Sequence, residues 1–80
     1  MERYFVHYKQ TVMSARTTSY DYEVVVANTP KDAEERLLKS KLHELNNGHN
    51  ICRIWRDTLF ATDMNGNAVT FEIAKTEEAW

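Results

Sequence analysis

The chain has 80 residues, a formal net charge of −2 and a single cysteine, Cys52. This length favours one domain, and a lone cysteine excludes an internal disulfide, so buried apolar side chains must stabilise the fold. The longest apolar run, 24–27, is far too short to cross a membrane. The slight acidic excess argues against nucleic-acid binding by bulk electrostatics. Because the first residues enter a strand pattern without a signal-peptide core, we expect a cytoplasmic protein.

The first two predicted elements are strands, because apolar and polar side chains alternate over 4–12 and again over 20–27. The polar segment 14–19 between them lacks glycine and predicts a wide hairpin loop. Antiparallel pairing is then expected to place four tyrosines and four valines on one face, against the core: Tyr4, Val6, Tyr8, Val12, Tyr20, Tyr22, Val24 and Val26.

A helix is predicted directly after the second strand. Asn28 or Thr29 can cap its start, and Pro30 suits the first helical position. The segment Asn46-Asn47-Gly48 is expected to end it, since asparagine and glycine tolerate a left-handed cap.

One face of this helix is expected to cover the sheet. Leu38, Leu42 and Leu45 form a stripe along it, whereas Ala33 and Leu37 lie about 100° around the helix. We expect the first stripe in the core and the second at its edge or exposed.

Three further strands complete the predicted fold. Residues 51–56 form one strand, and 58–62 pair with 68–74 around a turn at 63–67. The acidic tail, 75–80, is expected to fray unless Trp80 docks. The order ββαβββ indicates an α+β fold: a single domain over 1–80, with one twisted antiparallel sheet of about five strands and one helix packed on one face.

Two patterns involve cysteine and histidine. His43, His49 and Cys52 have zinc-type side chains, but a structural site needs a fourth ligand, which His7 or Asp57 would have to supply. Cys52 and His49 could in principle act as a nucleophile and its base, but no third group that would orient them is evident. A packed cysteine and two solvated histidines are the simpler interpretation.

The segment from Asp63 begins with the oxygen spacing of a calcium loop, because Asn65 and Asn67 follow at alternate positions. Such a loop also needs glycine at its sixth position and glutamate at its twelfth, where this chain has Ala68 and Ala74. A hairpin turn is therefore expected. We predict no catalytic residue, no metal, no cofactor and no enzymatic activity.

The solvent-facing side of the sheet carries the binding hypothesis. Phe5, His7 and Lys9 of the first strand are expected to neighbour Arg53 and Trp55 of the third. Aromatic and basic side chains on an open sheet can stack single-stranded bases, and such residues also anchor protein contacts.

Acidic residues weaken the nucleic-acid interpretation. Asp21 and Glu23, with Glu72 as a further candidate, are expected on the same face, where they would repel phosphate. We therefore favour a protein or protein–nucleic-acid complex as partner, with direct binding of single-stranded nucleic acid as the alternative. Either a monomer or a homodimer paired through a sheet edge or through Leu37 and Ala33 is possible, and no membrane contact is expected.

The element order resembles that of small phage and mobile-element proteins. The opening hairpin, the helix-start phrase Thr29-Pro30-Lys31-Asp32-Ala33-Glu34-Glu35 and the closing segments 51–55 and 59–66 carry the resemblance. The order is similar to that of some small anti-CRISPR proteins that inhibit the type I Cascade complex.

This resemblance implies a non-enzymatic inhibitor that binds a host protein–nucleic-acid defence complex in the host cytoplasm and blocks its nucleic-acid binding. By analogy, the basic residues to suspect are Lys9, Arg16, Arg53 and Arg56. Independently of the resemblance, we expect Trp55 to act as an apolar anchor in the contact.

Overall fold

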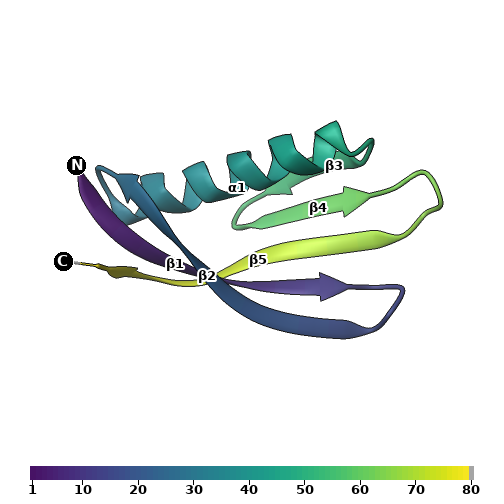
Figure 1. Ribbon diagram of the computed structural model, residues 1–80, viewed down its shortest axis with the longest axis horizontal. Helices are drawn as coiled ribbons and strands as arrows, with labels where there is room; N and C mark the ends of the chain where they lie inside the picture. Colours follow the sequence, from purple (N-terminus) through teal and green to yellow (C-terminus); the bar gives the residue numbers. More distant parts are fainter. Residues whose placement is uncertain (80) are drawn as a thin grey trace.

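The computed structural model describes residues 1–79 of the 80, and its five strands form one antiparallel sheet with the order β2-β1-β5-β4-β3 (Figure 1). In chain order the elements are β1 (Glu2–Val12), β2 (Thr17–Ala27), α1 (Pro30–Asn47), β3 (Ile51–Trp55), β4 (Thr58–Thr62) and β5 (Ala68–Glu78). The predicted α+β class and ββαβββ order are confirmed. Helix α1 covers one face of the sheet, and we call the opposite face the outer face.

The core lies between α1 and the sheet. Val6 of β1 and Leu59 of β4 have 0% of their surface exposed. From the helix, the buried side chains are Ala33, Leu37 and Leu38, all in its N-terminal half. The stripe prediction is therefore partly wrong: the pair expected at the edge belongs to the core, because α1 docks through its first turns, and the later leucines of the stripe are only partly buried.

The alternation in β2 runs opposite to the prediction. The register pairs Tyr4 with Val25 and His7 with Tyr22, so Val25 faces the core and Tyr22 the outer face. The turn joining the strands spans only 13–16, and Val12 pairs with Thr17, so the odd-numbered residues of β2 and not the even-numbered ones share a face with Tyr4 and Val6. Four predicted core residues thus lie on the outer face: Tyr20, Tyr22, Val24 and Val26.

Lys41 of α1 stabilises the carboxylate of Glu23 on the helix side of the sheet. Its Nζ lies 3.2 Å from Oε2 of Glu23 and 5.5 Å from the centroid of the Tyr8 ring. Burial acts to lower the pKa of Lys41, but the contact with Glu23 outweighs it and the pKa is raised. The lysine therefore stays charged where β2 passes beneath the helix.

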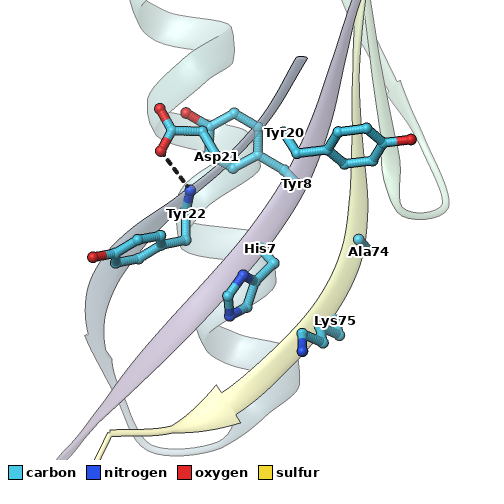
Figure 2. Close-up of a pocket in the computed structure, with 7 residues that line it drawn as sticks. All are labelled: His7, Tyr8, Tyr20, Asp21, Tyr22, Ala74 and Lys75. Carbon is cyan, nitrogen blue, oxygen red and sulfur yellow. Dashed lines mark hydrogen bonds between the residues drawn. The ribbon is translucent and has the colours of Figure 1, made fainter. Parts of the chain in front are cut away.

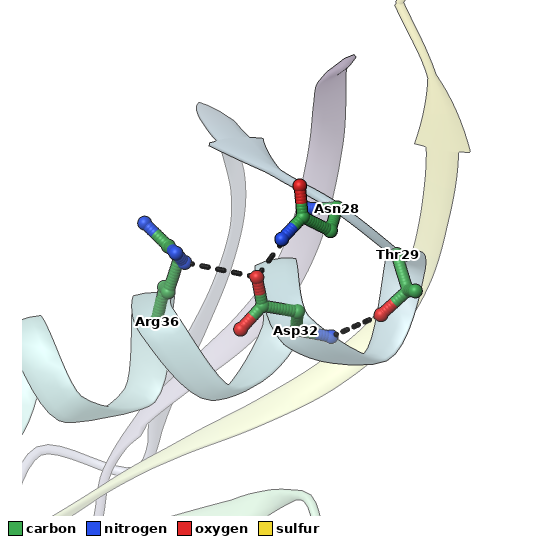
Figure 3. A network of polar contacts seen from close by, with 4 residues as sticks. All are labelled: Asn28, Thr29, Asp32 and Arg36. Atoms are coloured by element: carbon green, nitrogen blue, oxygen red, sulfur yellow. Dashed lines mark hydrogen bonds and ion pairs between the residues drawn. The ribbon is translucent and has the colours of Figure 1, made fainter. Parts of the chain in front are cut away.

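Polar contacts fix the start of α1 as predicted (Figure 3). The Thr29 hydroxyl accepts from the backbone N–H of Asp32 at 3.0 Å, and Pro30 occupies the first turn. The Asp32 carboxylate accepts from the backbone N–H of Asn28 at 3.3 Å and from Nε of Arg36 at 3.0 Å. No helix within residues 1–79 has the length and apolar content to span a membrane.

The end of α1 is a Schellman motif, and Gly48 is not its left-handed residue. The backbone N–H of Asn50 donates to the carbonyl of Leu45 at 3.2 Å, and that of His49 to the carbonyl of Asn46 at 3.1 Å. His49 adopts φ +66° while Gly48 has φ −86°. The helix stops where predicted, but the residue expected to supply the left-handed cap is wrong by one position.

Replacing His49 by glycine is expected to raise the free energy of unfolding by about 1 kcal/mol, because glycine adopts a positive φ without strain. Urea denaturation measures the change. The same exchange at the exposed His43, inside α1, is the matched control and should cost about 1 kcal/mol. Destabilisation at both positions would contradict the geometry of this helix end.

The tail of the chain is a strand. Lys75 pairs with His7 and Glu78 with Tyr4 at the end of β5, and the buried Ala79 donates its N–H to the carbonyl of Arg3 at 2.8 Å. The expected fraying is therefore wrong for these residues, and the docking of Trp80 lies outside the described residues.

A β-bulge explains why the sequence pattern did not predict that β5 continues beyond residue 74. The register shifts between His7 and Tyr8, which leaves Ala74 unpaired and reverses the alternation beyond it.

Candidate binding face

The strand registers order the outer face into transverse rows. With strands about 4.8 Å apart, a row across all five strands is roughly 19 Å long. One row, in sheet order, holds Tyr20, Lys9, Glu72, Thr58 and Trp55. The next holds Thr18, Thr11, Thr70, Phe60 and Arg53. Aromatic side chains therefore lie near both edges of this face, with polar side chains between them.

Three of the predicted contact residues, Lys9, Arg53 and Trp55, share the outer face, but Lys9 is not a neighbour of the other two. Strands β5 and β4 separate Lys9 from Trp55, so the expectation that the first and third strands lie side by side is wrong. The sequence pattern could not show this, because β5 inserts beside β1 from the far end of the chain. Lys9, Trp55 and Arg56 nevertheless line one open hollow of about 470 Å³.

The side chains of Arg53, Trp55, Arg56 and Phe60 form what we call the Arg–Trp corner. The guanidinium carbon of Arg56 lies 4.6 Å from the Trp55 ring centroid, and that of Arg53 lies 6.0 Å from the Phe60 centroid. Trp55 is 57% exposed. Among residues 1–79 neither arginine forms an ion pair, so both guanidinium groups can meet an external anion.

Two arginines occupy turns in a left-handed conformation. Arg56 has φ +57° in the two-residue turn between Trp55 and Thr58, where glycine or asparagine is favoured. Such a residue costs about 1 kcal/mol or more, which points to a use for its side chain other than folding. Arg16, with φ +52°, lies beyond the last pair of the β1–β2 ladder. The structure therefore separates it from the rows that hold Lys9, Arg53 and Trp55.

Charge divides the two faces of the sheet. On the outer face the strands carry the basic Arg3, Lys9, Arg53 and Lys75 and the acidic Glu72 and Glu77. On the helix side the described strands carry no basic residue, and their acidic residues are Glu2, Asp21, Glu23 and Glu78. Two of these carboxylates lie close together, since the hydrogen bond and charge of Glu2 raise the pKa of Glu78. The chain is acidic overall, but its open face is not.

Two predicted repulsive groups are thus absent from the outer face. The expectation that Asp21 and Glu23 lie there is wrong, because the observed register places them on the helix side and the tyrosines on the outer face. Glu72 does lie there, with its Oε1 3.3 Å from Nζ of Lys9. The hydrogen bond and charge of Lys75 hold the pKa of Glu77 below its ordinary value, so both outer carboxylates are paired with lysines.

A second hollow, of about 320 Å³, lies toward β2. Figure 2 shows His7 on β1 between Tyr22 on β2 and Lys75 on β5. The His7 ring is 5.6 Å from that of Tyr22, and its Nε2 makes no hydrogen bond but lies 3.7 Å from Oε1 of Glu77. Sequence reasoning missed Tyr22 and Tyr20 as surface residues, and only the length of the 13–16 turn could have revealed them.

Cys52 faces the helix side of β3, not the outer face. Its Sγ lies 3.8 Å from the carbonyl oxygen of Asn50, and burial raises the pKa of the thiol, which disfavours the reactive thiolate. Within residues 1–79, no three His, Cys, Asp or Glu side chains gather as metal ligands.

The Asp63 segment is the hairpin turn expected. Its carboxylate accepts hydrogen bonds from the Asn67 side chain at 3.1 Å and from the backbone N–H groups of Asn67 and Asn65 at 2.9 Å. These bonds, led by that of the Asn67 side chain, lower the pKa of Asp63. Both Asp63 carboxylate oxygens are therefore used within the turn, and Gly66 supplies its positive φ of 84°.

No protein-family model, curated protein or solved structure matches the chain significantly. The resemblance to small anti-CRISPR proteins stays a prediction. The candidate site is defined by the geometry and charge of the outer face.

Proposed function

We propose that this chain is a non-enzymatic binding protein that holds single-stranded nucleic acid against its outer face. One observation carries the proposal: aromatic and basic side chains gather on the face that α1 leaves open, while four strand carboxylates lie on the helix side. Single strands bind proteins by stacking bases on aromatic rings and by placing phosphates against cations. The outer face offers both kinds of contact.

Exposed rings supply the stacking contacts. Tyr20 is 75% exposed at the β2 end of its row, and Trp55 lies at the β3 end of the same row. A strand that stacks one base on each ring crosses β1, β5 and β4 and passes directly over Lys9. Tyr20 lies beside Lys9 and Trp55 lies beside Arg56. Each ring can therefore contact a base while the neighbouring cation contacts a phosphate.

Cations supply the phosphate contacts. Arg53 and Arg56 have no carboxylate partner among the described residues, whereas Lys9 is shared with Glu72. Three usable cations predict moderate affinity, because each phosphate neutralised releases counterions. The outer face is therefore expected to bind single strands more weakly than a strongly basic nucleic-acid-binding domain does.

The resemblance to anti-CRISPR proteins extends the proposal. A basic and aromatic face is attracted to the nucleic-acid component of a host defence complex, not to the positive groove that binds it. As a phage or mobile-element inhibitor in the host cytoplasm, the chain then covers the guide or target strand. Capture from host lysate tests this extension: recovery of the complex should vanish after nuclease treatment. A protein complex that survives nuclease would contradict a nucleic-acid contact.

Fluorescence titration with a single-stranded oligonucleotide of about 12 nucleotides tests the function itself. We expect quenching of Trp55 and an affinity whose logarithm falls with the logarithm of salt concentration with a slope of about −2, from three phosphate contacts. The variant W55F identifies the source of the quenching, since the chain has two tryptophans. An affinity that does not change with salt, or an absence of binding at low salt, would overturn the proposal.

A further inference from the structure

Strand β2 is a long, regular sheet edge whose only charged side chains are Asp21 and Glu23, both on the helix side. It runs unbroken for 11 residues along β1 and contains no proline, lysine, arginine or bulge. The opposite edge, β3, has five residues and carries Arg53. Long regular edges present a row of unpaired backbone N–H and C=O groups, and native proteins commonly blunt them with charge, proline or bulges. The two edges of this sheet therefore differ in their capacity to accept another strand.

Apolar side chains accompany the open edge. Val24 is 53% exposed on the outer face, and Val26 and Tyr22 on either side of it are also exposed. On the helix side, a groove of about 360 Å³ lies between the edge and α1, lined by Val25 and Leu37 and by the polar side chains of Glu23, Arg36 and Ser40. The apolar part of this groove can take a valine or alanine side chain that an added strand turns toward the helix side.

We infer that β2 pairs with β2 of a second copy of this chain, antiparallel, about a two-fold axis at Val24. In this register Val24 lies opposite Val24 of the second copy, Tyr22 opposite Val26, and Glu23 opposite Val25. Aromatic and β-branched cross-strand pairs are the favourable kind. Strand β2 is therefore self-complementary in this register.

Charge and the length of the pairing select this axis over its neighbours, since an axis at Val25 opposes no carboxylates but pairs only 23–27. An axis at Tyr22 sets Asp21 opposite Glu23, and an axis at Glu23 sets two copies of that carboxylate opposite each other; both arrangements are destabilising. An axis at Tyr20 also avoids opposed carboxylates but pairs 17–23 and leaves the valines exposed. The axis at Val24 pairs 21–27 and covers them.

The dimer joins two sheets into one without covering the outer faces. Because the axis is perpendicular to the sheet, both outer faces lie on the same side and the two Arg–Trp corners stand at opposite ends. The inference does not rest on the proposed function, since the edge and not the outer face makes the contact.

Sedimentation equilibrium over a concentration series, up to about 0.5 mM, tests the inference. We expect a monomer–dimer equilibrium for the natural chain and a dimer Kd raised at least about tenfold by Val24→Lys, which opposes two ammonium groups at the axis. Val24 is already exposed, so the monomer should keep its fold, which circular dichroism checks. The matched control is Ile51→Lys, at an 81% exposed position on the other edge, and it should leave the equilibrium unchanged.

Mixing opposite charges tests the position of the axis. Val24→Lys and Val24→Glu should each be monomeric alone and dimerise when mixed, because the lysine of one copy meets the glutamate of the other. A natural chain that stays monomeric throughout, an Ile51→Lys effect equal to that at Val24, or a mixture that fails to dimerise would each overturn the inference.

Discussion

Replacing Leu59 by alanine is expected to lower the free energy of unfolding by about 3 kcal/mol. The side chain lies on the helix side of β4, between Phe71 of β5 and Ile54 of β3, with no exposed surface. Its removal leaves a cavity that strands held on both sides cannot close. In a domain this small, such a loss is a large share of the total stability.

Urea or thermal denaturation followed by circular dichroism measures this change. The control is Ile51→Ala on β3, where the side chain is exposed and its removal should change the unfolding free energy by less than about 0.5 kcal/mol. Equal effects at the two positions would mean that the core does not lie between α1 and the central strands.

Reversing the charge at Arg53 is expected to weaken oligonucleotide binding by about tenfold or more at physiological salt. The variant Arg53→Glu removes one of the two corner cations that have no carboxylate partner and places a negative charge beside the strand. The matched control is Lys39→Glu, which makes the same charge change at an exposed position of α1, on the other side of the sheet. Its affinity should stay within about twofold.

Arg56→Gly separates binding from folding. Glycine suits the φ of +57° at this turn, so the variant should be more stable than the natural chain and yet bind the oligonucleotide more weakly. Loss of binding together with a higher melting temperature cannot come from unfolding. Undiminished binding in both Arg53→Glu and Arg56→Gly would remove the Arg–Trp corner from the site.

Local signals in the sequence were sufficient for the element order. The Thr29 cap and Pro30 mark the start of α1 in the chain itself, and the hydrogen bonds that form there involve residues within one turn. The end of the helix was located equally well, although His49 rather than Gly48 takes the left-handed position. Signals of this kind need no knowledge of distant partners.

The faces of the strands were harder to predict, because they depend on pairing. In β2 the run from Val24 to Ala27 is apolar on both faces, and the alternation of Tyr20 and Tyr22 with Asp21 and Glu23 indicates the wrong face, because the turn length sets the pairing. In β5 the bulge at Ala74 reverses the alternation and conceals four further strand residues. Both features depend on how the strands pair, which the hydrophobic periodicity of one segment does not show.

The candidate site was accordingly predicted in part. Lys9, Arg53 and Trp55 do share the outer face, because each lies on the expected side of its own strand. The order of the sheet, set by the pairing of β5 with β1, determines how far apart they stand. The tyrosines that complete the face were assigned to the core, and Arg16 lies apart from the rows.

Backbone amide NMR during titration with a single-stranded oligonucleotide tests the central claim most directly, because it reports where on the chain the contact is made. We predict shifts that concentrate on the outer face around Lys9, Trp55 and Phe60 and leave the amides of α1 unchanged. Shifts concentrated on α1, or none at saturating oligonucleotide, would contradict the assignment of the outer face as the binding surface.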